Sequence, residues 1–74
     1  MTLEDPESLL EAFERFPEQA INALRTAIER AGSISKLAEE TGVRRQTLAM
    51  WLRGAVTPSQ HSVRTVLEWL RRHP

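Results

Sequence analysis

The sequence predicts an all-α fold, a compact five-helix bundle that forms a single domain over residues 1–74. Apolar residues recur at intervals of three and four along the chain, and no stretch shows the sustained alternation that indicates a strand. Prolines and glycines divide this pattern into five segments, each with residues that begin or end helices. A chain of 74 residues is long enough to bury one modest core.

The first two predicted helices are separated by Pro17. The first, which is acidic, covers about residues 6–16, with Asp5 as the expected N-cap and Pro6 at the first helical position. Pro17 disfavours helical geometry at the residue before it and suits the start of the next helix. That second helix runs to Gly32, which suits a left-handed C-terminal cap. Its expected buried face consists of Ala20, Ile21, Ala23, Leu24, Ala27, Ile28 and Ala31.

Two short helices are predicted in the middle of the chain. Ser33 is the expected N-cap of the third helix, which ends at Gly42. The fourth helix covers about residues 45–53, and Gly54 closes it. The residues expected to face the core are Ile34, Leu37 and Ala38 in the third helix and Leu48, Trp51 and Leu52 in the fourth.

The last helix is predicted to begin with a capping box. In this interpretation Thr57 is the N-cap, Pro58 takes the first helical position and Gln60 lies three residues after the cap. Trp69 lies beside the core stripe of this helix, so it is either a flank of the core or part of a surface for a partner. The stripe itself consists of Val63, Val66, Leu67 and Leu70.

Charge is distributed unevenly along the chain, although the formal net charge is zero. Residues 1–31 carry seven acids against three arginines, a net charge of −4, whereas residues 32–74 carry seven bases against three glutamates, a net charge of +4. This asymmetry indicates that one face meets an anionic partner, although two balanced sets of charges that only solvate the surface explain it equally well.

Composition disfavours several classes of function. The chain has no cysteine for a disulfide or a thiolate metal site, and its two histidines, His61 and His73, have no further ligand at metal-binding spacing. No serine or threonine lies in a nucleophile motif, so we expect no catalytic residues, no metal and no cofactor. The N-terminus has no apolar segment of a signal peptide, and no run approaches ~18 apolar residues. These features predict a cytoplasmic protein without a membrane partner.

Residues 34–53 have the spacing that two short helices need in order to cross at a steep angle. Ala38 is small where the second helix passes, Gly42 tolerates a positive φ in the turn, and Val43 fills the core after it. The second helix adds two apolar anchors, Leu48 and Trp51. This pattern predicts a central helix-turn-helix motif.

In the segment ISKLAEETGVRRQTLAMWLRG, residues 34–54, the chain resembles the lambda-repressor/Cro-like helix-turn-helix family. The similarity extends weakly to about residues 20–70, and the acidic helix at 6–16 is not part of it. The resemblance implies a sequence-specific regulator of transcription, of the kind found in phages, plasmids and antitoxins. It also implies a homodimer on a double-stranded DNA operator, with the helix at 45–53 in the major groove.

The resemblance also assigns the exposed positions of the motif to DNA. Arginine pairs with guanine and glutamine with adenine, so Arg45 and Gln46 are expected to read bases. Ala49 and Met50 face the same groove and are expected to pack on thymine methyl groups. The residues expected to contact phosphates are Ser33, Ser35, Lys36, Arg44, Thr47, Arg53, Thr57 and Ser59.

Simpler roles for several of these residues stay open. Ser33 and Thr57 are explained by capping alone, and Arg53 suits the negative end of its helix dipole. Met50 fills a core as readily as it contacts a base.

Arg44 and Arg45 stand where a helix normally has a serine, threonine or acidic cap, against the positive end of its dipole. DNA supplies the missing negative charge if this end meets phosphate and guanine. Alternatively, Glu39 or Glu40 neutralises Arg44 across the turn.

A function of another class also stays open. The fold can serve as a protein-interaction module, an antirepressor or a toxin-neutralising partner, that uses its acidic N-terminal helix at about 6–16. An acidic surface repels DNA and attracts a basic protein partner, which is the reason for this alternative.

Overall fold

The computed structural model describes residue 11, residue 15 and residues 17–74, and this part of the chain is helical and contains no strand. The predicted all-α class is thereby confirmed. Four helices are described: α2 (Pro17–Ala31), α3 (Ile34–Thr41), α4 (Arg45–Leu52) and α5 (Gln60–Arg72). The predicted count of five is not matched, because the helix predicted at 6–16 lies outside the described residues except for Glu11 and Arg15.

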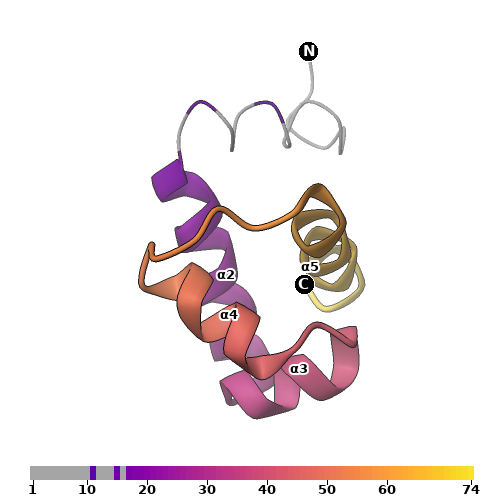
Figure 1. Cartoon of the computed structure of the whole chain (residues 1–74). Helices are drawn as coiled ribbons and strands as arrows, with labels where there is room; N and C mark the ends of the chain where they lie inside the picture. Colours follow the sequence, from indigo (N-terminus) through magenta and orange to yellow (C-terminus); the bar gives the residue numbers. More distant parts are fainter. Residues whose placement is uncertain (1–10, 12–14, 16) are drawn as a thin grey trace.

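The core lies between α2 and the three helices that follow it. α2 contacts α3, α4 and α5, and α3 also contacts α4 and α5 (Figure 1). Burial of one large apolar side chain in this core contributes about 1.5–3 kcal/mol to the stability of the fold. The largest fully buried side chains come from all four described helices: Leu24, Leu37, Leu48, Trp51 and Val66. All five positions belong to the apolar faces predicted from helical spacing, so the spacing identified the inward side of each described helix.

Trp69 belongs to the core. The sequence allowed either a position at the flank of the core or one on a surface for a partner. Its side chain is only 6% exposed, and its indole Nε1–H donates a hydrogen bond of 2.9 Å to Glu40 Oε1. α3 packs against this side of α5, so the buried sector of α5 is wider than its apolar stripe. A partner surface built on an exposed Trp69 is therefore not available.

The predicted ends of α2 and the predicted limits of α3 are confirmed. Gly32 has a φ of 104°, and its N–H donates to Ile28 O at 2.9 Å. The Ser33 hydroxyl then caps α3 by accepting the Lys36 N–H at 3.0 Å. Gly42, with a φ of 78°, ends α3 in the left-handed conformation.

The end of α4 agrees with the prediction to within one residue. Arg53 is the C-cap rather than the last helical residue, and Gly54 follows with a φ of 72°. The Gly54 N–H bonds to Trp51 O and the Ala55 N–H bonds to Met50 O, each at 2.9 Å. This pair of bonds is a Schellman motif, which satisfies two carbonyls at the helix end.

The predicted start of the last helix is wrong, because α5 begins two residues later. Ser59, not Thr57, is the N-cap, and its hydroxyl accepts the Ser62 N–H at 3.1 Å. Gln60 is the first helical residue rather than the partner in a capping box, and Pro58 lies before the cap. The connection after α4 has to cross to the start of α5 (Figure 1). An extended residue spans about 3.3 Å and a helical one only 1.5 Å, so the later cap gives the longer reach.

Candidate nucleic-acid interface

The turn between α3 and α4 is held by one hydroxyl group. Thr41 Oγ1 donates to Leu37 O at 2.7 Å and accepts the Val43 N–H at 3.2 Å. Gly42 provides the positive φ that reverses the chain, and Val43 is buried, with 9% of its surface exposed. The predicted roles of Gly42 and Val43 are confirmed. This turn sets the direction in which α4 leaves α3.

α4 has a buried side and an outward side. Leu48 and Trp51 are buried. Because successive residues turn by about 100° around the helix, Gln46, Ala49 and Met50 point away from these two. Gln46 is exposed, whereas Ala49 and Met50 are half-buried. Arg45 is exposed at the edge of the outward side. The structure therefore brings the four predicted base-reading residues, Arg45, Gln46, Ala49 and Met50, to one outward surface.

The N-terminus of α4 is open in the described part of the chain. Arg44 is the N-cap in an extended conformation, with φ −60° and ψ 137°, and no side chain caps the helix there. Neither Glu39 nor Glu40 pairs with Arg44 among the described residues, and the carboxylate of Glu40 is bonded to Trp69 instead. The positive end of the helix dipole and the charges of Arg44 and Arg45 thus add to one another.

Three predicted phosphate contacts lie together at the start of α3. Ser33 is its N-cap, and Ser35 and Lys36 follow in its first turn; all three are exposed. The backbone N–H of Lys36 is taken by the Ser33 hydroxyl. The capping role of Ser33 is therefore present whether or not it also contacts DNA.

The other predicted phosphate contacts are spread over α4 and the connection that follows it. Arg44 and Arg53 are exposed at the two ends of α4, and Thr47 is half-buried within it. Thr57 is exposed and caps no helix, so capping does not explain it. Ser59 is the cap of α5. None of these residues is buried.

A protein-family model described as helix-turn-helix matches residues 21–72, which is most of the chain. This chain belongs to the lambda-repressor/Cro-like helix-turn-helix family. The family, a group of DNA-binding regulatory domains that are typically not enzymes, was predicted from residues 34–54; the match extends from within α2 to the end of α5. Neither a curated protein nor a solved structure matches the chain.

The described part of this helix-turn-helix domain contains no group of three histidine, cysteine or acidic residues that can hold a metal ion. None of its helices is long and apolar enough to cross a membrane.

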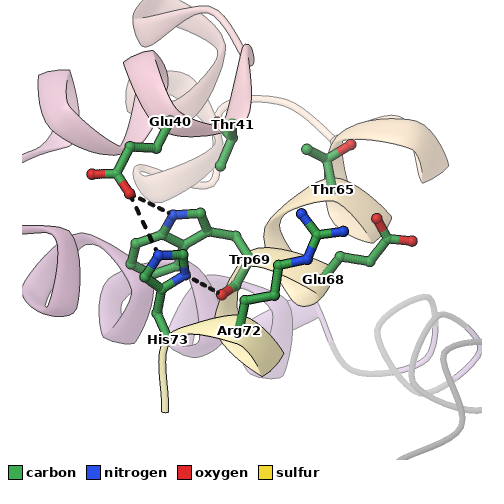
Figure 2. A pocket seen from close by; sticks show the side chains of 7 residues that line it. All are labelled: Glu40, Thr41, Thr65, Glu68, Trp69, Arg72 and His73. Atoms are coloured by element: carbon green, nitrogen blue, oxygen red, sulfur yellow. Dashed lines mark hydrogen bonds and ion pairs between the residues drawn. The ribbon is translucent and has the colours of Figure 1, made fainter.

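Sequence reasoning missed one interaction beside the helix-turn-helix motif. Glu40, near the end of α3, is bonded to Trp69 of α5, which lies 29 residues further along the chain (Figure 2). His73 Nε2 lies 3.7 Å from the same carboxylate oxygen. No local spacing rule connects residues so far apart, so the sequence carried no signal for this contact.

Proposed function

We propose that this domain is a sequence-specific regulator of transcription, repressor-like or Cro-like, that binds double-stranded DNA by inserting α4 into the major groove. The open N-terminus of α4 carries this proposal: a helix without a side-chain cap presents two exposed arginines that have no acidic partner among the described residues. Anionic DNA supplies both the counter-charge and the hydrogen-bond acceptors that this end lacks.

The distribution of charge supports a nucleic-acid partner better than the net charge of zero does. Residues 21–72, the part matched by the family, contain nine bases and four acids, a net charge of +5. The acidic excess lies in residues 1–16, which contain five acids and one arginine. The helix-turn-helix part is therefore electropositive by itself.

In this proposal the outward surface of α4 reads the bases. Arg45 donates two hydrogen bonds to guanine, and Gln46 exchanges a pair of hydrogen bonds with adenine. Ala49 and Met50, half-buried on the same surface, offer apolar contact to thymine methyl groups.

The phosphate contacts in this proposal surround that surface. Lys36 and the two ends of α4 contribute charge, whereas hydroxyl groups and the N-termini of α3 and α5 contribute donors. The full set consists of Ser33, Ser35, Lys36, Arg44, Thr47, Arg53, Thr57 and Ser59. All of these side chains are exposed or half-buried.

Selection of binding sites from randomised double-stranded DNA, followed by a salt titration of the selected site, tests the proposal. We expect a recurring site that contains guanine and adenine, and an affinity that falls steeply with salt because bound phosphates release their counterions. The absence of any enriched site together with a salt-independent affinity overturns the proposal. A variant with Arg44, Arg45 and Gln46 all changed to alanine is the control, and it should enrich no site.

A further inference from the structure

The carboxylate of Glu40 faces two side chains from the end of α5, one of which donates a hydrogen bond to it. Trp69 Nε1–H donates to Glu40 Oε1 at 2.9 Å, and His73 Nε2 lies 3.7 Å from this oxygen. The two rings stack, with their centroids 4.2 Å apart and an angle of 12° between their planes. Figure 2 shows both rings on the same side of the carboxylate. Glu40 therefore points toward α5.

The last turn of α5 is itself held in place. His73 Nδ1 lies 2.8 Å from Trp69 O, and the His73 N–H donates to the same carbonyl at 3.0 Å. From α2, Arg30 donates to His73 O at 3.3 Å. Glu40, Trp69 and His73 line an open groove on the surface. Arg72 and Glu68 line this groove from the α5 side. Contacts from α2 and α5 thus fix the two rings that hold Glu40.

Lys36 is the neighbour that Glu40 would otherwise be expected to pair with. Residues four apart on a helix have Cβ atoms about 5–6 Å apart, and a lysine and a glutamate at this spacing attract one another. In the described part of the chain, however, Lys36 makes no ion pair and its side chain makes no hydrogen bond. The Glu40 carboxylate is bonded to Trp69 of α5 instead.

We propose that Trp69 and His73 are positioning residues that hold the Glu40 carboxylate away from Lys36 and so keep the Lys36 ammonium free for a DNA phosphate. The second half of this inference rests on the proposed DNA-binding function. A carboxylate released next to Lys36 competes with phosphate for the ammonium, so fewer counterions are released when DNA binds. Trp69 and His73, at the end of α5, thereby raise the affinity of the first turn of α3 for DNA.

The inference is tested by measuring DNA affinity over a range of salt concentrations for the variant Trp69→Phe, which keeps a ring but removes the donor. We expect the Kd to rise roughly twofold to fivefold and the salt slope to fall by up to about 0.9, the value of one lost phosphate contact. Both changes should vanish when Glu40→Gln is also present, because that substitution removes the charge that competes for Lys36.

Glu39→Gln is the matched control, since Glu39 is exposed. Removal of its charge changes the net charge of the protein by the same amount as Glu40→Gln does. In the Glu39→Gln background, Trp69→Phe should still raise the Kd. An equal rise in the wild-type, Glu39→Gln and Glu40→Gln backgrounds indicates a purely structural effect and overturns the inference, as does the absence of any rise.

A second measurement needs no DNA. Thermal unfolding of Lys36→Gln, Glu40→Gln and the double variant should show no coupling between the two sites in the wild type and a stabilising coupling in the Trp69→Phe background. An unchanged coupling overturns the inference even if DNA binds as proposed. If the wild type binds no DNA, the proposed function fails, and so does the inference that Lys36 is kept free for a DNA phosphate. The unfolding measurements still decide whether Trp69 and His73 hold Glu40 away from Lys36. If Trp69→Phe does not fold, His73→Ala, at a half-exposed site, replaces it with the same expected direction.

Discussion

At the scale of single residues, the start of α4 differs from the starts of α3 and α5 because no side chain caps it. Ser33 and Ser59 cap α3 and α5 with their hydroxyl groups, whereas Arg44 offers no acceptor to the first turn of α4. A missing cap costs about 1 kcal/mol, and a positive side chain beside the positive end of a helix dipole adds to that cost. Local rules are expected to fail where a residue serves binding rather than stability.

Arg45→Ala and Gln46→Ala should each weaken binding to the selected DNA site by about 1–3 kcal/mol, because each removes a pair of hydrogen bonds to one base. The loss of specificity should be confined to one base pair for each variant. Affinity measurements on a set of singly substituted sites will show this. A uniform loss over all sites for Arg45→Ala would assign this residue to the backbone instead.

Lys36→Ala is the matched comparison for these two variants. It should weaken binding to every sequence alike and reduce the salt slope by about 1, because a phosphate contact carries no sequence information.

At the scale of the helices, α4 depends on its surroundings more than α3 or α5 does. Like α3, it has eight residues, too few for a stable isolated helix, but unlike α3 and α5 it has no side-chain cap. Leu48 and Trp51 anchor it to the core, and the Thr41 hydroxyl fixes the turn before it. Packing therefore maintains α4 although no side chain caps its first turn.

The cap of α5 can be assigned by stability measurements. Ser59→Ala should reduce the free energy of unfolding by about 1 kcal/mol, since it removes the acceptor for the Ser62 N–H. Thr57→Ala, the control two residues earlier, should change it by less than about 0.5 kcal/mol, as expected for an exposed residue that caps no helix. Urea unfolding followed by circular dichroism measures both values. A larger loss for Thr57→Ala than for Ser59→Ala would restore the capping box predicted from the sequence.

At the scale of the whole molecule, one domain presents one α4, which reaches only a few base pairs. Specific binding by a single short helix is weak, so we propose that the protein binds its operator as a homodimer. The sequence offers two candidate dimer surfaces, the Trp69 side of the last helix and the N-terminal helix predicted at 6–16. Trp69 is buried, and the helix predicted at 6–16 lies outside the described residues except for Glu11 and Arg15.

A homodimer predicts a symmetric operator. The selected sites should contain two inverted half-sites whose centres are about 34 Å apart, one turn of DNA. Sedimentation of the protein with such a site should show two chains per duplex. A single half-site without symmetry, bound by one chain, would contradict the dimer and leave the proposed role of α4 intact.

Much of the fold and the placement of the candidate site followed from local patterns. The left-handed glycines at 32 and 42, the cap at Ser33 and the outward position of Arg45 and Gln46 all depend on residues within about one helical turn. The same local reasoning misplaced the start of α5, because Thr57 and Ser59 are both good caps and the span from α4 decides between them.

The sequence by itself determined the helical class, the limits of α3 and the helix-turn-helix motif, because caps and periodic apolar faces act over a few residues. Only the tertiary structure decided that Trp69 is buried and that it holds Glu40, since α5 and α3 meet through packing. The physical reason is distance along the chain. A hydrogen bond between residues 29 positions apart forms only after the core has brought the two helices together.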